Sequence, residues 1–343
     1  MKTNGADLGG GDLEIFADRR WPVDTGIGKV QLELEARLPD RMRIVDLKVK
    51  GRIGSPLSPL AITRALSGAR SRGVYFSAGF VPPLASKLPS VVIVHDLTHR
   101  RFYGPTKRAY YDHIYKPLYR RCDAIICVSE FTRQEFLDWS GMPADQVHMV
   151  YNGVEAMFSE DGPSYNPGHR YVLYCGNHRP YKNLARLIEA YASSTLPKNG
   201  IRLVLSGNRN AELSELAAGL GIGDFVVFAG RIPAEDIPSY YRGALAVVYV
   251  SLFEGFGLPI VEAFSCGVPV ITSNVSAMPE VAAGGGLIVD PQSVDEIRTA
   301  LDRVVGETDL RERLIRAGRQ RRTDFDWNKS AARTWEIVGN LGD

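Results

Sequence analysis

The chain of 343 residues has only four cysteines, no long apolar run and little net charge. The cysteines lie singly in apolar stretches without CxxC spacing, which favours buried thiols over disulfides or a metal site. No stretch approaches the roughly 18 apolar residues of a membrane span, and residues 1–12 lack the basic and apolar regions of a signal peptide. A net charge of +2 does not indicate nucleic-acid binding. We therefore expect a cytoplasmic protein without a nucleic-acid partner.

Motifs of two other enzyme classes are either missing or in the wrong place. No GxGxxG with a matching ribose acid follows the first apolar run, so a dinucleotide-dependent oxidoreductase is not indicated. The only Asp-x-Asp triplet, residues 324–326, stands before the last amphipathic segment, where a helix N-cap is the expected role. We expect no catalytic metal and no cofactor.

Short apolar runs alternate with amphipathic segments along almost the whole chain, a pattern typical of parallel sheets covered by helices. The runs are apolar without alternation, so we expect strands that are buried on both faces. The twelve expected strands are residues 13–17, 43–47, 73–77, 91–95, 124–128, 147–151, 170–175, 201–206, 225–230, 245–250, 268–272 and 286–290.

A linker rich in Gly, Pro and polar residues separates the first six expected strands from the last six, at residues 155–170. Since a domain has about 150 residues, the chain is long enough for two. We expect α/β domains at 1–165 and 166–325 and a C-terminal helix at 326–343. Ligands of such open sheets bind beyond the carboxyl ends of the strands, so two facing sheets would enclose a cleft.

The most informative segment is residues 251–281, which pass from an expected strand through a glycine turn into a helix near Pro259. The free N–H groups of such a helix favour phosphate. Glu254 lies in the loop and Glu262 on the first turn of the helix, so both can face one ligand. Carboxylates accept strong hydrogen bonds from sugar and ribose hydroxyls. Taken alone, Glu254 is also consistent with a solvent-exposed residue of the loop, and Glu262 with a carboxylate that complements the helix dipole.

A second strand-to-helix loop, in YCGNHRPYKNLARLIEAY, places Arg179 and Lys182 where they can neutralise a diphosphate, unless both merely decorate the loop. In the N-terminal half, TGIGK places Gly26 and Gly28 at a helix start, where glycine lets the backbone approach a phosphate. A tight turn would use glycine as well. His95 ends the strand VVIVH and can contact a sugar hydroxyl or serve as a hydrogen-bonded turn residue.

The spacing of the two acids within EGFGLPIVEAFSCGVPVI resembles the motif of glycosyltransferase family 4, and the likeness extends from TGIGK to DWNKSA near the end of the chain. Members of this family have the GT-B fold, α/β with two Rossmann-like domains whose parallel sheets face each other across a deep cleft. Their C-terminal helix crosses back to the N-terminal domain. The resemblance implies that residues 1–165 bind the acceptor and residues 166–325 bind a nucleotide-sugar donor.

The resemblance also implies roles for single residues. Glu262 would hold the nucleotide ribose and Glu254 the hydroxyls of the donor sugar, while His95 would lie beside the reacting carbon. Lys182 matches a phosphate-binding lysine, but Tyr181 stands where relatives carry the arginine of PRKN, so Arg179 is an inferred substitute. The residues expected to bind the donor are Gly26, Gly28, Gly176, Asn177, Lys182, Glu254, Gly255, Phe256, Gly257, Leu258 and Glu262; those expected in catalysis are His95, Arg179, Lys182 and Glu254.

The implied activity is retaining, metal-independent transfer of a hexose to a glycan or a polyprenyl-diphosphate-linked saccharide. The segments VIVHDLTH, SEFTRQEF and PYKNL resemble bacterial mannosyl- and rhamnosyltransferases of surface polysaccharide synthesis, which favours mannose from GDP-mannose. Transfer of rhamnose or glucose from a dTDP- or UDP-sugar stays open, as does a non-catalytic GT-B protein that binds nucleotide or glycan. A glycoside hydrolase would also use paired carboxylates, but it has no need of phosphate sites.

Residues 100–121 contain seven Lys or Arg, one acid and six aromatic residues. Such a helix suits the surface of an anionic membrane or a polyprenyl diphosphate. A helix whose tyrosines pack on the sheet is the alternative. Peripheral contact with the inner face of the cytoplasmic membrane is therefore an open expectation.

Overall fold

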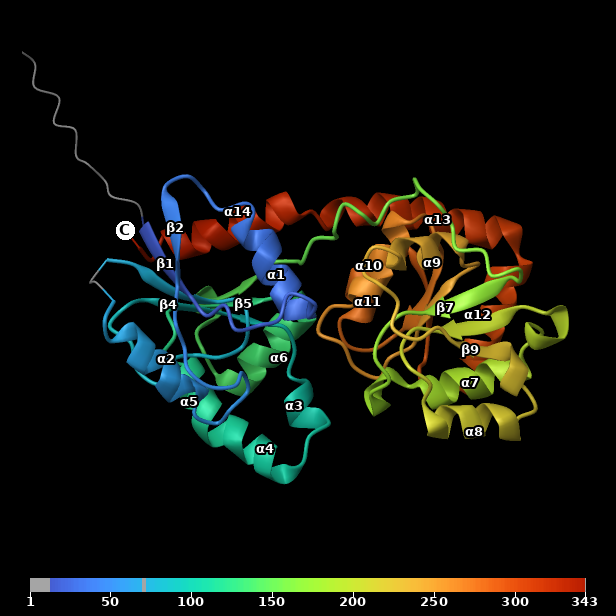
Figure 1. Ribbon diagram of the computed structural model, residues 1–343, viewed down its shortest axis with the longest axis horizontal. Helices are drawn as coiled ribbons and strands as arrows, with labels where there is room; N and C mark the ends of the chain where they lie inside the picture. The colour runs from blue at the N-terminus through green and yellow to red at the C-terminus, as the bar shows by residue number, and fades with distance from the viewer. Residues whose placement is uncertain (1–12, 70–71, 343) are drawn as a thin grey trace, which may run out of the picture.

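The computed structural model describes residues 13–69 and 72–342. Residues 1–12, for which the sequence predicted no signal peptide, and Asp343 at the end of the predicted last helix lie outside the described residues. The chain forms two lobes, each with its own six-stranded sheet (Figure 1). Every strand pair in both sheets is parallel. The predicted GT-B fold, with two facing α/β units, is confirmed.

All twelve predicted strands are present within a few residues of their expected bounds. The first sheet has the order β2-β1-β3-β4-β5-β6 and consists of β1 (Leu13–Ala17), β2 (Met42–Asp46), β3 (Val74–Ser77), β4 (Ser90–Val94), β5 (Ala124–Cys127) and β6 (Val147–Met149). The second has the order β12-β11-β10-β7-β8-β9 and consists of β7 (Tyr171–Tyr174), β8 (Arg202–Leu205), β9 (Val226–Phe228), β10 (Val247–Tyr249), β11 (Val270–Ser273) and β12 (Gly286–Val289).

The strand order determines where each sheet can bind a ligand. Counted from β7, the second sheet has the Rossmann order, and its order reverses between β7 and β10. In the first sheet the reversal lies between β1 and β3. Loops that leave the carboxyl ends of such neighbouring strands part to opposite faces of the sheet, which leaves a crevice between them. The segments after β7 and β10 are those that carry Lys182 and Glu254.

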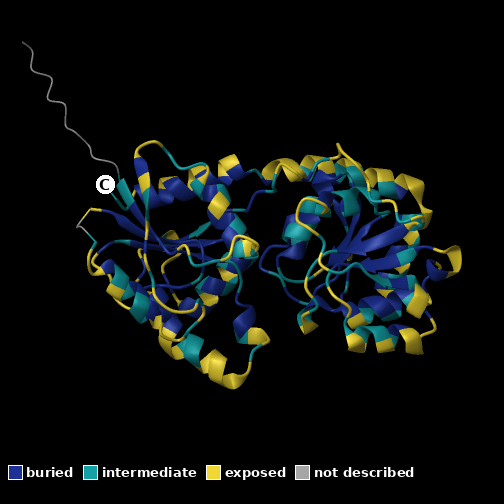
Figure 2. Ribbon diagram, in the orientation of Figure 1, coloured by how far each residue is buried: buried dark blue, intermediate teal, exposed yellow. Residues whose placement is uncertain are grey.

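Helices cover both faces of each sheet, which explains why the strands are apolar without alternation. All residues of β4 and β7 are buried, and Figure 2 shows buried strands beneath helices that are exposed on their outer sides. The helices of the first lobe are α1 (Gly26–Glu35), α2 (Ser58–Leu66), α3 (Thr98–Arg101), α4 (Pro105–Tyr110), the π-helical turn Tyr111–Tyr115, α5 (Lys116–Tyr119) and α6 (Glu130–Ser140). Those that follow are α7 (Leu184–Ser193), α8 (Ala211–Gly219), α9 (Ile237–Gly243), α10 (Leu258–Ser265), α11 (Met278–Ala282), α12 (Val294–Gly306), α13 (Thr308–Arg321) and α14 (Trp327–Gly339). Short 3-10 turns lie at Ala144–Gln146, Pro180–Lys182, Pro197–Asn199, Gly223–Phe225 and Arg322–Asp324.

The chain passes between the lobes twice, once between β6 and β7 and once between α13 and α14 (Figure 1). The predicted boundary at residue 165 lies in the first connection. Asp326 caps α14 by accepting a hydrogen bond from the N–H of Asn328. On α14, Trp335 packs against Phe76 of β3, with ring centroids 5.1 Å apart, and its indole N–H donates to the carbonyl of Leu34 at 3.0 Å. The last helix therefore returns to the first lobe, as predicted.

The basic stretch at residues 100–121 is not one helix: α3 ends at Arg101, and after residues 102–104 a second, continuous helical run passes through α4, the π-helical turn and α5. Its tyrosines mostly face inward: Tyr115 and Tyr119 are fully buried and belong to the core of the first lobe. The alternative in which the tyrosines of this stretch pack against the sheet therefore describes them better than a membrane surface does. Within residues 13–69 and 72–342, we find no helix with both the length and the apolar character that a bilayer span requires.

Candidate active site

A cleft of about 420 Å³ lies between the lobes at the carboxyl ends of the strands. All predicted site residues except Gly28 and Arg179 line it. The residues that line the cleft are Gly26, Ile27, Lys29, Val30, His95, Asp96, Val128 and Asn152 of the first lobe, Phe158 of the connection, and Cys175, Gly176, Asn177, Lys182, Ile237, Tyr249, Glu254, Gly255, Phe256, Gly257, Leu258, Pro259 and Glu262 of the second. The structure thus brings together residues that are far apart in the sequence.

Lys182 and Glu254 form an ion pair at the crevice between β7 and β10. The Lys182 Nζ lies 2.6 Å from Oε1 of Glu254, and the two side chains are only 8% and 12% exposed. The same ammonium donates to the hydroxyl of Tyr249 at 2.8 Å. An ammonium has three N–H donors, so these two bonds leave one donor for a ligand. The sequence predicted both residues in the site but not the bond between them.

Glu262 lies on the second turn of α10, one turn later than predicted, because the helix begins at Leu258. Its Oε2 accepts a hydrogen bond from the hydroxyl of Tyr241 on α9 at 2.5 Å. Burial raises the pKa of Glu262 to about 7, although the hydrogen bond from Tyr241 and the charge of Lys29 act in the opposite direction. The carboxylate is therefore in a place where a hydroxyl donor from a ligand would stabilise its charge.

The glycine turn before α10 fits tightly against the first lobe. A Cβ on Gly255 would lie 1.8 Å from the carbonyl oxygen of His95. Gly257, the N-cap of α10, has φ of +112°, a conformation that favours glycine. The carbonyl of Gly255 accepts hydrogen bonds from the hydroxyls of Ser129 at 2.6 Å and Thr132 at 2.9 Å. The two lobes are thus in contact at the loop that carries Glu254.

His95 is held in its neutral form with a defined tautomer. Its Nε2 lies 2.7 Å from the carbonyl oxygen of Ala78, which can only accept a hydrogen bond, so Nε2 carries the proton. Burial lowers the pKa of His95. The other ring nitrogen, Nδ1, is then an acceptor. Asp96 accepts a hydrogen bond from the N–H of Thr98 at 2.8 Å and so stabilises the turn after β4.

Two predicted site residues lie outside the cleft lining. A Cβ on Gly28 would lie 2.0 Å from the carbonyl oxygen of Pro22, so this glycine permits close packing of its own loop. A Cβ on Gly26 would meet no atom of the described residues within 4 Å, and Gly26 is the glycine that faces the cleft. Arg179 contacts the hydroxyl of Tyr103 in the first lobe, at 3.4 Å.

Tyr181, which departs from the family pattern, packs on the other lobe. Its ring centroid lies 5.2 Å from that of Phe102 on the first lobe. Phe102 also contacts the ring of Phe253 at 6.0 Å. The start of the basic stretch is therefore part of the contact between the lobes, and Phe102, an aromatic residue for which both a membrane surface and packing were open, packs against the second lobe.

Sequence reasoning missed Lys29, Tyr241 and Tyr249. Lys29 lines the cleft from α1, and its Nζ lies 2.6 Å from Oε1 of Glu155. A cation directly after the glycine loop was a usable signal for it. Tyr249 ends β10, next to the segment already singled out. Tyr241 lies on a helix that the motifs do not include, and only the fold brings it to Glu262.

The fold and the cleft between its lobes define a protein of the GT-B class. Comparisons with family models agree: the model described as "Glycosyl transferases group 1" matches residues 160–321, and the one described as "Glycosyltransferase Family 4" matches residues 44–157. The chain belongs to glycosyltransferase family 4 and is a glycosyltransferase.

Curated relatives include three mannosyltransferases. O-antigen chain mannosyltransferase B of Escherichia coli is 28% identical, and the alignment covers 93% of this chain and 97% of that protein. O-antigen chain mannosyltransferase RfbU of Salmonella typhimurium is 25% identical, with 71% of this chain and 68% of that protein covered. MMP alpha-(1->4)-mannosyltransferase of Mycolicibacterium hassiacum is 28% identical, with 68% and 57% covered.

Solved structures support the fold. HepE of Anabaena in complex with UDP and glucose superposes with a TM-score of 0.77 at 18% identity, and the match covers 96% of this chain and 99% of that one. WaaG, a glycosyltransferase involved in lipopolysaccharide biosynthesis, superposes with a TM-score of 0.73 at 16% identity, with 95% and 99% covered. At these identities the likeness concerns the fold alone.

Proposed function

We propose that the protein transfers a hexose from a nucleotide-sugar to a glycan or a lipid-linked saccharide, with retention of anomeric configuration and without a metal. The observation that carries this proposal is the pairing of Lys182 with Glu254 at the strand-order reversal between β7 and β10, with Glu262 on the neighbouring helix. This places a cation and two carboxylates at the crevice where such a sheet binds a nucleotide.

Each group has a task that suits its chemistry. Glu262 accepts hydrogen bonds from the ribose hydroxyls, and Glu254 accepts them from the hydroxyls of the sugar. The third N–H of Lys182 contacts the diphosphate and stabilises the charge that builds on it as the glycosidic bond breaks. The backbone at Gly26, Gly176 and the N-terminus of α10 supplies further phosphate contacts.

Lys182 has a second effect because it is bonded to Glu254. A carboxylate beside a developing positive charge on the sugar would otherwise be free to move towards the anomeric carbon. Held at 2.6 Å from the ammonium, Glu254 is fixed as a binding group. The leaving diphosphate then guides the acceptor hydroxyl to the same face of the sugar, which gives retention without a protein nucleophile.

The first lobe provides the acceptor side. Neutral His95, with Nδ1 as an acceptor, can receive a hydrogen bond from a hydroxyl of the sugar or the acceptor. Lys29 on α1 and Arg179 add positive charge at the edge of the cleft. The lobes are in contact at Gly255, so a donor and an acceptor that fill the cleft would displace its water, which disfavours hydrolysis of the donor.

Mannose from GDP-mannose is the favoured donor because the relatives just described are named mannosyltransferases, one of them over almost the whole length of both chains. Relatives from O-antigen synthesis favour a bacterial polysaccharide as the product. A UDP-sugar is the second candidate, because HepE of similar fold was crystallised with UDP and with UDP-glucose. A dTDP-sugar, such as the donor of rhamnose, is the third candidate donor.

A panel of GDP-, UDP- and dTDP-sugars tests the proposal, with release of nucleoside diphosphate and transfer to a saccharide acceptor as readouts. We expect turnover with a GDP-sugar that is unaffected by EDTA, and a product with the donor's anomeric configuration by NMR. Glu254→Gln and Lys182→Ala should abolish turnover. Glu160→Gln is the matched control, because Glu160 pairs with Arg319 on the second lobe away from the cleft.

A non-catalytic protein that binds nucleotide or glycan is the rival function. It predicts that the protein is stabilised by a nucleoside diphosphate but turns over no donor with any acceptor. Thermal stabilisation by GDP, UDP and dTDP identifies the base in either case, because a ligand that binds only the folded state raises the melting temperature.

Peripheral contact with an anionic membrane is the last part of the proposal. The exposed cations Lys107, Arg108 and Arg121 and the exposed side chain of Ile114 in the same stretch support it. Pelleting with anionic vesicles should therefore occur at low salt and weaken as salt is added. No binding to such vesicles at low salt would contradict this contact and would leave the proposed sugar transfer untouched.

A further inference from the structure

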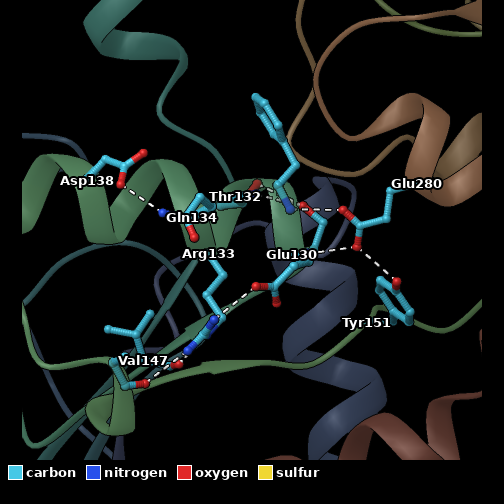
Figure 3. Close-up of polar contacts among 11 residues, drawn as sticks. Glu130, Thr132, Arg133, Gln134, Asp138, Val147, Tyr151 and Glu280 are labelled. Carbon is cyan, nitrogen blue, oxygen red and sulfur yellow. Dashed lines mark hydrogen bonds and ion pairs between the residues drawn. The ribbon is translucent and has the colours of Figure 1, made fainter.

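A carboxylate of the second lobe binds the N-terminus of a helix in the first lobe. Glu280 of α11 accepts hydrogen bonds from the backbone N–H groups of Glu130 at 2.7 Å and Phe131 at 2.9 Å, the first two residues of α6 (Figure 3). The hydroxyl of Tyr151, just after β6, donates to the same carboxylate at 2.9 Å. Three donors that belong to the first lobe and its exit segment thus converge on one side chain of the second.

The hydrogen bonds at the start of α6 are divided between the two lobes. The first N–H groups of a helix have no partner within it. The N–H of Thr132 is bound by the hydroxyl of Ser129, the N-cap of α6, at 3.0 Å. Among residues 13–69 and 72–342, the partner of the N–H groups of Glu130 and Phe131 is Glu280, across the lobes. A negative charge is also favoured at this end of the helix by its dipole.

The same turn of α6 holds the loop of the candidate active site. The hydroxyls of Ser129 and Thr132 are fully buried and donate to the carbonyl of Gly255, directly after Glu254. The start of α6 therefore contacts the second lobe at two points, the carboxylate of Glu280 and the carbonyl of Gly255. A movement that breaks the first contact also loosens the second, because both lie within one helical turn.

Glu280 is held in place by the second connection between the lobes. The guanidinium of Arg321, at the end of α13, donates to the carbonyl oxygens of Glu280 at 2.8 Å and Val281 at 3.1 Å. The same guanidinium stacks over the rings of Tyr151 and Phe325, at 5.6 Å and 4.7 Å from their centroids. Glu280 thus contacts Tyr151 of the first connection through its carboxylate and Arg321, just before the second, through its backbone.

We propose that Glu280 is a positioning residue that keeps the lobes closed during the reaction. By binding the start of α6, it holds the Gly255 loop, and Glu254 with it, against the backbone of His95. The bonds are reversible, because on opening both the carboxylate and the two N–H groups are hydrated instead. The kinetic consequence rests on the proposed sugar transfer, whereas the structural consequence does not.

Hydrogen exchange of the Glu280→Gln variant tests the contact itself. The amides of Glu130 and Phe131 should exchange about tenfold faster than in the wild type, since charge-assisted hydrogen bonds to them are lost. The rest of α6 should keep its protection, because the Ser129 cap remains. Glu160→Gln, which removes a carboxylate bonded to Arg319 at 2.7 and 2.6 Å, is the control and should change neither amide.

Scattering and kinetics test the consequence. In small-angle X-ray scattering, Glu280→Gln should have a larger radius of gyration than the wild type and Glu160→Gln. With donor and acceptor, its kcat should fall about tenfold while the KM for the donor changes less than about twofold, because the proposed donor groups Glu262, Lys182 and Glu254 are all in the second lobe. Tyr151→Phe, which leaves both backbone bonds intact, should have a smaller effect.

Three outcomes would overturn the proposal. One is wild-type exchange at Glu130 and Phe131 in Glu280→Gln. Another is faster exchange along all of α6 with an unchanged radius of gyration, which would reduce Glu280 to a stabiliser of that helix. The third is an equal fall of kcat in Glu160→Gln. If the wild type turns over no donor, the proposed sugar transfer fails, but exchange and scattering still decide whether Glu280 holds the lobes.

Discussion

Replacing Lys182 by methionine should destabilise the protein, because Glu254 would stay in the cleft without its cation. Nζ and Oε1 are 2.6 Å apart, and the side chains are 8% and 12% exposed. Removing one partner of a buried ion pair costs about 3–5 kcal/mol. Water can reach Glu254 through the cleft, so we expect a loss of about 2–3 kcal/mol in the free energy of unfolding, or about 5 °C in Tm. Methionine keeps most of the volume of the lysine stem.

A double-mutant cycle in urea isolates the pair. Lys182→Met and Glu254→Gln should each destabilise, and the double variant should be more stable than the sum of the two changes predicts, by at least about 1 kcal/mol. Tyr249→Phe, which removes the other hydrogen bond of the ammonium, should cost only about 1 kcal/mol. Additive effects within about 0.5 kcal/mol would refute the reasoning, because they would mean that the ion pair contributes nothing.

Three further predictions follow from single contacts. Burial raises the pKa of Glu262 to about 7, so ionising this carboxyl costs stability as the pH rises from about 4.5 towards 7. Urea unfolding at several pH values should show that the wild type loses up to about 3 kcal/mol over this range. Glu262→Gln should not show this loss. Gly255→Ala should lower kcat about 100-fold, because the added methyl would lie 1.8 Å from the carbonyl oxygen of His95 and would push the lobes apart. Trp335→Ala should cost about 3–5 kcal/mol of unfolding free energy, because it removes a buried ring and its hydrogen bond to Leu34.

Each of these three predictions has a control variant or a result that would contradict it. A slope of stability against pH that is the same in Glu262→Gln and the wild type would show that another group titrates. Gly104→Ala, where an added Cβ meets no atom within 4 Å in the part of the chain that the structure describes, should leave kcat unchanged. A loss below about 1 kcal/mol for Trp335→Ala would mean that α14 adds little to the first lobe.

The sequence predicted the sheets well because their strands are apolar on both faces. Runs such as VVIV and VYFS are too short for helices and are bounded by turns, and the structure has each of them as a buried strand. Site residues that directly follow the strands were also predictable from the sequence. Glu254 and Lys182 follow β10 and β7, and the carboxyl ends of parallel strands share one edge of the sheet.

Contacts between distant residues were not predictable in the same way. The bond from Tyr241 to Glu262 joins two helices, and that from Glu130 to Glu280 joins two lobes. No local pattern marks either. The aromatic residues at 100–121 show the same limit, because a basic helix with tyrosines has one composition whether Tyr115 faces a membrane or, as the structure shows, the core.

The return of α14 to the first lobe affects the order in which the chain can complete its fold during synthesis. The first sheet ends at β6, yet part of its cover arrives only with Trp335, after the whole second lobe has been made. Until then the ring of Phe76 lacks its packing against Trp335, and the carbonyl of Leu34 lacks the hydrogen bond from the indole. The two lobes therefore do not complete their folding in the order of the sequence. The second lobe can be fully folded before α14 has packed on the first.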